Sequence, residues 1–178
     1  MTAREQILSE ISFDTEAASL EAIFEQYSGY VARIGMRVLG RNDEIDDLVQ
    51  DVFIAAFKGI SGLKDPGAVK GWLATVTVRK ATRRLQLRRL KRMVSLDSVA
   101  NYRENATKGA TAEQKMMLAN VYEVLDDLPA KNRVAWTLRH IEGEQLKDVA
   151  RLSECSLATA KRRIEAAHSV IKSRLNNG

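Results

Sequence analysis

The chain has 178 residues, of which 45% are hydrophobic and 29% are charged, and its formal net charge is +5 at pH 7. This composition is typical of a soluble globular protein with one domain or two small ones. No apolar run reaches the roughly 18 residues that a membrane span needs, and the acidic N-terminus lacks the pattern of a signal peptide. A single cysteine, Cys155, excludes an internal disulfide framework. We therefore expect a cytoplasmic protein that inserts in no membrane.

The charge is distributed unevenly along the sequence. Residues 1–60 carry 5 basic and 11 acidic side chains, whereas residues 61–95 carry 10 basic and 1 acidic, a net charge of +9. Such a density of like charge costs self-repulsion unless an anion relieves it. The pattern indicates two partners of opposite charge, although the acidic part alone fits a solvated surface equally well.

Hydrophobic residues recur at three- and four-residue steps through most of the chain, which predicts an all-α fold. Asp14 or Thr15 is suited to begin the first long helix, and Gly40 is suited to end it. The segment Leu73–Val78 is β-branched but runs into a long basic stretch without a turn, so it too is interpreted as helix. The predicted helices span about 15–39, 43–58, 72–94, 113–126, 130–141, 145–152 and 156–175.

The pattern fails between the third and fourth helices, where the sequence is polar and has no sustained period. We interpret residues 95–111 as a flexible linker between an N-terminal domain, 1–94, and a C-terminal domain, 112–178. Each domain is short and its core is small, so the two are expected to behave as separate units on a tether.

The last two predicted helices have the size and spacing of a helix-turn-helix. Ser156 can cap the second helix, which leaves its first turns free to face base edges. Lys161 and Arg162 can donate to guanine or to phosphate, Glu165 can accept from cytosine, and Arg163 can meet the phosphate backbone. An ordinary helical hairpin with a charged outer face is the alternative.

A loop over residues 60–71 precedes the basic helix that opens at Trp72. A basic helix beside a loop can follow a phosphate backbone and hold an unstacked base. Packing of Trp72 on the first two helices is the favoured alternative for that residue. The basic residues are Arg79, Lys80, Arg83, Arg84, Arg88, Arg89, Lys91 and Arg92.

A third feature is an acidic helix in which Asp47, Gln50 and Asp51 can share one outer face beside a hydrophobic stripe. Such a face suits docking to a basic partner helix, and simple solvation of the helix is the alternative. The chain contains no Gly-rich phosphate loop and no nucleophile elbow. With two histidines and one cysteine, a zinc site is not expected. We predict a protein that is not an enzyme and needs no cofactor or metal.

These features, in this order, resemble the extracytoplasmic-function group of bacterial RNA polymerase sigma factors. The resemblance runs from about Leu20 to Leu175. It is carried by FEQYSGYVARIGMRVLG, DEIDDLVQDVFIAAFKGI, GWLATVTVRKATRRL, LDDLPAKNRVAWTLRHIEGEQLKDVARLSECS and LATAKRRI, of which DLVQDVF is the most specific. It implies a region 2 domain at the N-terminus, a region 4 domain at the C-terminus, and binding to core RNA polymerase and promoter DNA. It also implies an anti-sigma factor as a partner and a monomer when free.

The resemblance also implies a role for individual residues. The polymerase-docking residues would be Asp47, Leu48, Gln50, Asp51 and Phe53. Contact with the −10 element, including capture of a flipped base by the loop, would involve Leu63, Lys64, Trp72, Arg79, Lys80, Arg83 and Arg84. The −35 element would be read around Lys147, Ser156, Thr159, Lys161, Arg162, Arg163 and Glu165.

Four positions depart from the common pattern of this family. Arg79 and Arg83 replace a frequent asparagine and aspartate, Glu154 replaces the turn glycine of the helix-turn-helix, and Ala166 replaces a frequent arginine. A turn without glycine lacks its easiest residue. The departures concern promoter preference rather than the class of protein.

Two other classes of protein remain open at this point. A free-standing helix-turn-helix regulator with an N-terminal dimerisation or sensing domain would bind a palindromic operator tightly without polymerase. An inhibitory interaction module such as an anti-sigma protein would bind polymerase or sigma without touching DNA, which the net charge of +9 over residues 61–95 argues against.

Overall fold

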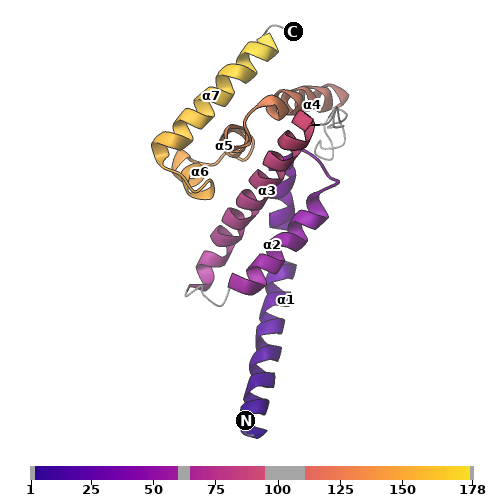
Figure 1. The fold of residues 1–178 in the computed structure, drawn as a ribbon, viewed down its shortest axis with the longest axis vertical. Helices are drawn as coiled ribbons and strands as arrows, with labels where there is room; N and C mark the ends of the chain where they lie inside the picture. Colours follow the sequence, from indigo (N-terminus) through magenta and orange to yellow (C-terminus); the bar gives the residue numbers. More distant parts are fainter. Residues whose placement is uncertain (1–2, 60–64, 95–110, 177–178) are drawn as a thin grey trace.

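The computed structural model describes residues 3–59, 65–94 and 111–176, and within them every regular element is a helix (Figure 1). This confirms the all-α prediction, while the predicted linker falls almost wholly outside the described residues. No described helix combines the length and the apolar character that a membrane span requires. In chain order the elements are α1 (Ala3–Leu39), α2 (Ile45–Gly59), the short 3-10 helix η2 (Pro66–Ala68), α3 (Val69–Val94), α4 (Ala112–Asp127), α5 (Ala130–His140), α6 (Leu146–Leu152) and α7 (Leu157–Asn176).

Two predicted helix starts were wrong. The first helix begins at Ala3 and runs through Asp14 and Thr15 without a break. Many of the residues between Ala3 and Asp14 are strong helix formers, so the helix extends over them. The third begins at Val69 rather than Trp72, since η2 leads directly into it. The prediction that Leu73–Val78 is helical is confirmed. There the Oγ1 atom of Thr77 donates to the Leu73 carbonyl oxygen at 2.7 Å, a bond that suits threonine to a helix.

The first three helices pack around a shared apolar stripe. Residues from α1, α2 and α3 meet in one buried cluster that includes Val31, Val38, Leu48, Val52, Leu73 and Val78. Arg84 and Arg88 of α3 reach across to α2 and the turn before it, where they pair with Asp51 at 2.6 Å and with Glu44 at 2.7 Å. The three-helix bundle therefore has a fixed geometry that presents the outer face of α2 to solvent.

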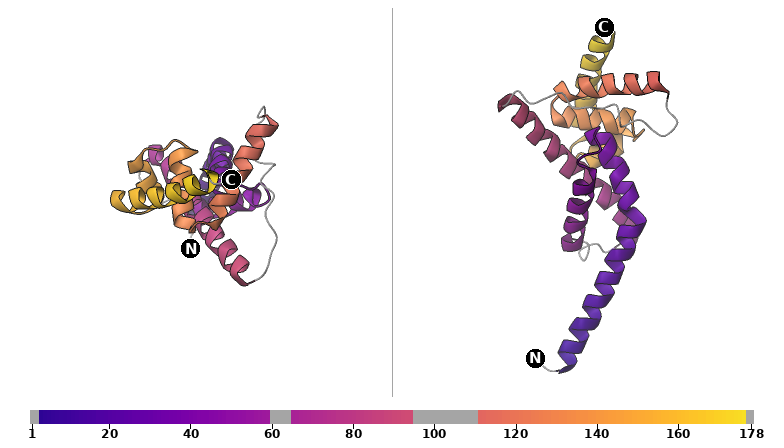
Figure 2. Two further views of the ribbon diagram at one scale, coloured as in Figure 1. Left: turned by 90° about the horizontal axis from the view of Figure 1, so that it is seen from above. Right: turned by 90° about the vertical axis from the view of Figure 1, so that its right-hand side faces the viewer.

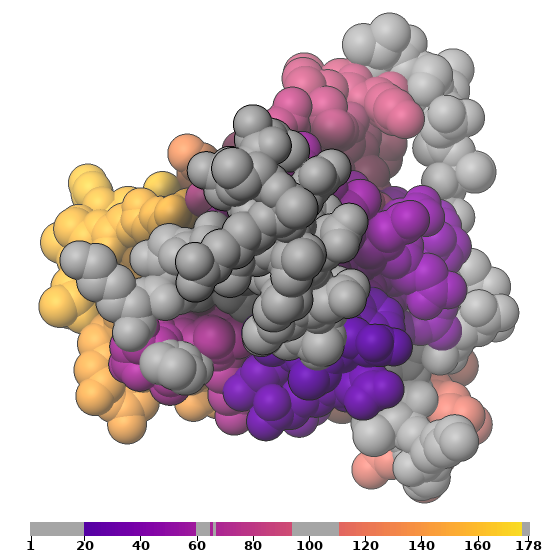
Figure 3. All heavy atoms as spheres, turned by 90° about the horizontal axis from the view of Figure 1, so that it is seen from below, coloured from indigo at the N-terminus to yellow at the C-terminus, as the bar shows by residue number. Residues whose placement is uncertain are grey.

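The two halves of the chain do not lie apart. The same buried cluster continues into the C-terminal half through Val134, Leu138, Val149 and Leu152 of α5 and α6. A second cluster, built around Tyr122, Trp136 and Ile171, joins α4, α5 and α7. The space-filling view shows the surface of the C-terminal helices adjoining that of α3 (Figure 3), and the ribbon views place α3 beside α5 and α6 (Figure 2). The prediction of two independent units on a tether is not met in this arrangement, because the short helices bury their apolar faces against each other.

A buried arginine connects the halves. Arg133 of α5 is 1% exposed, and its guanidinium donates to the carbonyl oxygens of Val38 at 3.2 Å and Leu39 at 2.7 Å. It also pairs with Asp126 and lies over the ring of Tyr122. The last carbonyls of α1 lack partners within their own helix and carry partial negative charge, so a cation is well placed there. Arg133 thus caps α1 from the other half of the chain.

The turn after α1 depends on glycine, as predicted. Gly40 has φ +69° and its N–H donates to the Met36 carbonyl oxygen at 2.7 Å. A Cβ atom at this position would lie 2.7 Å from Cε1 of Tyr122, whose hydroxyl donates to the Arg37 carbonyl oxygen.

We expect Gly40→Ala to lower the free energy of unfolding by about 2 kcal/mol or more, because it adds left-handed strain to a steric clash. Gly29→Ala is the control, since nothing lies within 4 Å of a Cβ at that helical position. It should raise stability by up to about 1 kcal/mol. Urea denaturation of both variants tests this, and equal effects would contradict the account of Gly40.

Candidate functional site

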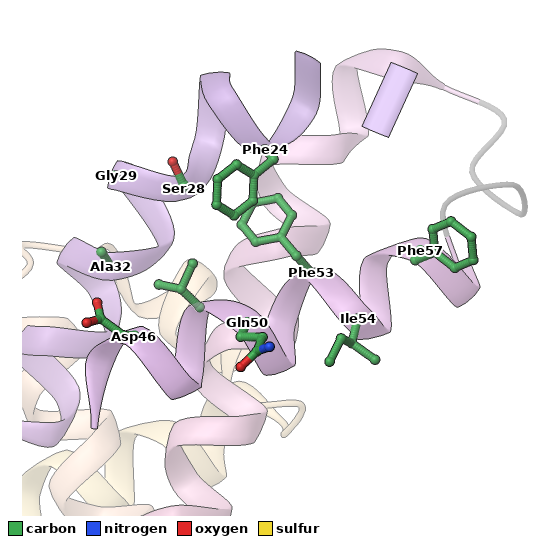
Figure 4. A pocket seen from close by; sticks show the side chains of 10 residues that line it. Phe24, Ser28, Gly29, Ala32, Asp46, Gln50, Phe53, Ile54 and Phe57 are labelled. Carbon is green, nitrogen blue, oxygen red and sulfur yellow. The ribbon is translucent and has the colours of Figure 1, made fainter. Parts of the chain in front are cut away.

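The outer face of α2 forms an apolar groove with α1. The rings of Phe24 and Phe53 stack edge to face with centroids 4.8 Å apart, and Ile54 and Phe57 are 51% and 54% exposed beside them. Figure 4 shows Phe53 of α2 pointing toward Phe24 of α1, with Gln50, Ile54 and Phe57 also on α2 and Ser28, Gly29 and Ala32 on α1. Asp46 adds a carboxylate to the lining. An exposed apolar groove with an acidic edge suits a partner helix that is apolar and basic.

The residues predicted to dock a partner occupy different positions on α2. Asp47 and Gln50 are exposed and Phe53 is half-buried in the groove, so all three are accessible. Leu48 is 0% exposed and packs in the core. Its side chain therefore cannot make the contact with a partner that was predicted for it. Asp51 is half-buried and holds Arg84, which ties it to the bundle as well as to the surface.

Three groove residues were missed at the level of sequence. None of Phe24, Ile54 and Phe57 was predicted to contact a partner, yet all three are exposed large apolar side chains. A signal was available for Ile54, which is apolar but lies outside the buried stripe of Leu48, Val52 and Ala56.

The basic residues of α3 divide into two groups. Arg79 and Arg83 are exposed and line a cleft toward the C-terminal half, and Lys80 is half-buried. Arg84 donates to Asp51 and to the Glu44 carbonyl oxygen, and Arg88 donates to Glu44, so these two have structural roles. In the structure Arg84 therefore faces α2 instead of an open surface for DNA.

Trp72 packs inside its own half of the chain, which is the alternative that the sequence favoured over contact with DNA. Its ring is half-buried against the bundle core, and its Cζ2 atom would be 3.0 Å from a Cβ on Gly59. Stacking of this ring on a base is therefore not supported by its packing. The loop residues Leu63 and Lys64 lie outside the described residues.

The helix-turn-helix is formed by α6 and α7. Ser156 caps α7 as predicted, since its Oγ atom accepts from the N–H of Thr159 at 3.2 Å. The turn between the helices is closed by the N–H of Cys155, which donates to the Ala150 carbonyl oxygen at 3.0 Å. Glu154 has φ +48°, the left-handed conformation that glycine adopts most easily, so the expectation about this turn is confirmed.

The outer face of α7 carries the predicted DNA-reading residues. Lys161 and Glu165 are 67% and 63% exposed and lie 3.8 Å apart as an i,i+4 pair. Arg162 is exposed and donates to Oγ1 of Thr159 at 3.4 Å, and Lys147 is exposed on α6. Arg163 is half-buried and lines the cleft toward α3, so its predicted contact with backbone phosphate is not available in this arrangement.

The two histidines stack in the C-terminal half. The rings of His140 and His168 have centroids 5.5 Å apart, and the ring of Trp136 lies 5.0 Å from that of His140. Burial, with the His168 charge as a smaller cause, lowers the pKa of His140. Within the described residues no three histidine, cysteine or acidic side chains gather in a way that could hold a metal ion.

The chain is similar to known proteins in sequence and in fold. Residues 23–92 match the model for Sigma-70 region 2. The chain is 28% identical to the ECF RNA polymerase sigma-E factor of Haemophilus influenzae, covering 96% of this chain and 95% of that protein. It is 25% identical to the Escherichia coli sigma-E factor, with 96% and 94% covered.

Two solved structures share the fold. One is the sigma factor RpoE in complex with the anti-sigma factor NepR from Bartonella quintana, with a TM-score of 0.63, 21% identity, and 89% of this chain and 97% of that one covered. The other is CnrH in complex with the cytosolic domain of CnrY, with a TM-score of 0.59, 19% identity and 90% of each chain covered. The region 2 match covers residues 23–92, and the similarity to ECF RNA polymerase sigma-E factors extends over 96% of the chain.

Proposed function

We propose that this chain is a sigma factor of the extracytoplasmic-function group. It docks on core RNA polymerase through the groove of α2, engages the −10 element with α3 and reads the −35 element with α7. The proposal rests mainly on the separation of two surfaces. The apolar groove with its acidic edge lies between α1 and α2, whereas the exposed basic residues assigned to the promoter elements, such as Arg79, Arg83 and Lys161, lie on α3 and α7. Residues 1–94 would act as the region 2 domain and residues 112–178 as the region 4 domain.

The docking contact would rest on Asp47, Gln50 and Phe53, joined by the exposed Ile54 and Phe57. Aromatic and apolar side chains in a groove supply most of the energy of such contacts, while rim charges set partner and orientation. Leu48 supports this face from beneath, because it is wholly buried.

Promoter opening would need no bond chemistry from the protein. The loop that contains Leu63 and Lys64 would hold a flipped base, and Arg79, Lys80 and Arg83 would follow the phosphate backbone on α3. Binding of an extruded base offsets the few kcal/mol that unstacking costs. The contribution of the protein is differential binding to the opened DNA, so we propose that it is not an enzyme.

Simultaneous contact with both promoter elements requires the halves to separate. Elements about 25 base pairs apart are roughly 85 Å apart along B-form DNA at about 3.4 Å per base pair. In this structure α3 and the turn before α7 are within ion-pair distance, since Nη1 of Arg79 lies 3.8 Å from Oε1 of Glu154. The described arrangement is therefore a closed form, and the form bound to polymerase and promoter would be open.

The two solved structures that share this fold bear on the protein partner expected to inhibit the chain. One fold relative, the sigma factor RpoE of Bartonella quintana, is in complex with an anti-sigma factor, and the other, CnrH, is in complex with the cytosolic domain of CnrY. We propose that this chain, too, is a cytoplasmic sigma factor, monomeric when free, that binds an anti-sigma factor.

Base reading by α7 is testable at one side chain. Lys161→Ala should weaken promoter binding by the polymerase holoenzyme by about 1–3 kcal/mol, and only on DNA with the preferred −35 sequence. Lys172→Ala, further along the exposed face of the same helix, is the control. An equal loss on every −35 sequence would show a phosphate contact instead. No loss at all would remove Lys161 from the interface.

A further inference from the structure

A cleft between the two halves gathers basic side chains from three helices around one carboxylate. Among the described residues that line it, four are basic and one is acidic. Like charges brought together repel each other, so the basic residues that line the cleft oppose the packing of the two halves against each other. The charged residues are Arg79 and Arg83 of α3, Lys131 of α5, Arg163 of α7 and Glu154 of the turn between α6 and α7.

Glu154 is positioned to relieve that repulsion. Its Oε1 atom lies 3.8 Å from Nη1 of Arg79, across the boundary between the halves. Its backbone is left-handed at φ +48°, a conformation that residues with a side chain rarely adopt. Strain of this kind persists only where the surrounding structure fixes the backbone, as the hydrogen bonds of the turn between α6 and α7 do here. Here the side chain supplies the carboxylate that the basic cleft needs.

The partner of Glu154 is a residue assigned above to promoter DNA. A carboxylate oxygen and a phosphate oxygen accept from the same guanidinium donors, so the two anions compete for Arg79. We propose that Glu154 is an intramolecular substitute for a DNA phosphate: it occupies Arg79 and favours the closed form, and the promoter backbone replaces it when the halves separate. The assignment of Arg79 to DNA rests on the proposed function, whereas the closing effect of Glu154 does not.

The size of the effect follows from the exposure of the pair. Arg79 and Glu154 are 58% and 53% exposed, so the contact is solvated and screened by salt. Exposed pairs of this kind change an equilibrium by roughly twofold to fivefold at low ionic strength. Glu154 therefore adjusts the ratio of closed to open molecules, while the shared apolar core makes the closed form the major one.

Thiol labelling measures that ratio without DNA or polymerase. We would place a cysteine at the fully buried Ala135 of the shared core, in a Cys155→Ala background, and follow its reaction with a thiol reagent. Glu154→Gln should speed labelling about twofold to fivefold at low salt and less at high salt. Glu123→Gln, an exposed glutamate on α4, should leave the rate unchanged. Exchange of the two charges, Arg79→Glu with Glu154→Arg, should return the rate toward that of the parent.

Two further results separate the parts of the proposal. Glu154→Gly removes both the charge and the backbone strain. If labelling became faster in Glu154→Gly but stayed unchanged in Glu154→Gln, the electrostatic role would be overturned. In DNA binding by the free protein, Glu154→Gln should gain the same factor as in labelling, because the competent fraction rises. Faster labelling with unchanged DNA affinity would contradict the assignment of Arg79 to DNA. Unchanged labelling would overturn the inference whatever the promoter assays show.

Discussion

Arg133→Met is expected to be the most destabilising single substitution described here, with a loss of about 3–5 kcal/mol in the free energy of unfolding. Removal of one partner of a buried ion pair is strongly destabilising. Asp126 would keep only its longer contact with Arg92, at 3.5 Å, among the ion pairs described here. The variant would lose a partner of Asp126 and the bonds to the carbonyl oxygens of Val38 and Leu39 at the end of α1. Urea denaturation followed by circular dichroism measures the loss.

The matched control is Arg89→Met on the exposed face of α3, which should change stability by about 0.5 kcal/mol or less. The double variant Asp126→Asn with Arg133→Met should lose less stability than the sum of the two single variants, because the pair between Arg133 and Asp126 can be lost only once. If Arg133→Met behaved like its control, Arg133 would not cap α1 in solution and the closed form would not be the main form of the free protein.

Asp47→Arg should weaken binding to core RNA polymerase by about 3 kcal/mol, roughly 100-fold, without affecting the fold. A cation in place of an exposed carboxylate on the docking face would oppose the basic partner that this face is expected to meet, and such like-charge contacts cost several kcal/mol. Titration of labelled sigma factor with purified core enzyme gives the affinity, and thermal unfolding checks the fold.

The control for this change is Glu123→Arg, which makes the same charge change on exposed α4. Asp51 is a poorer test residue than Asp47, because its pairing with Arg84 at 2.6 Å would add a structural effect. Equal affinities of Asp47→Arg and wild type for core enzyme would refute docking through α2.

Local chemistry determined the parts of the structure that were predictable. The glycine turn at Gly40 and the cap at Ser156 follow from backbone needs that neighbouring residues settle, and both are present. The helix-turn-helix likewise follows from spacing within one short segment. The family resemblance, rather than local chemistry, marked Glu154 as the residue in place of the turn glycine, and its backbone is left-handed.

Contacts between distant segments account for what was missed. Arg133 resembles a surface arginine in sequence, and its backbone partner Val38 lies 95 residues away. Asp51 and Arg84 are 33 residues apart, so nothing near either one predicts that they pair. Periodicity placed both Leu48 and Phe57 on the buried stripe of α2, but only Leu48 is buried, because periodicity cannot show which positions the neighbouring helices leave uncovered. The docking role of Leu48 was implied by the family resemblance alone. The closed packing of the halves depends on all of these contacts together.

Run-off transcription with purified core polymerase on a library of random promoters tests the central claim most directly. We expect initiation only when the protein and core enzyme are both present, and a shared −35 and −10 sequence among the templates used. The protein alone should bind duplex DNA weakly. Tight binding to a palindromic site without polymerase, together with no initiation above that of core enzyme, would contradict the account.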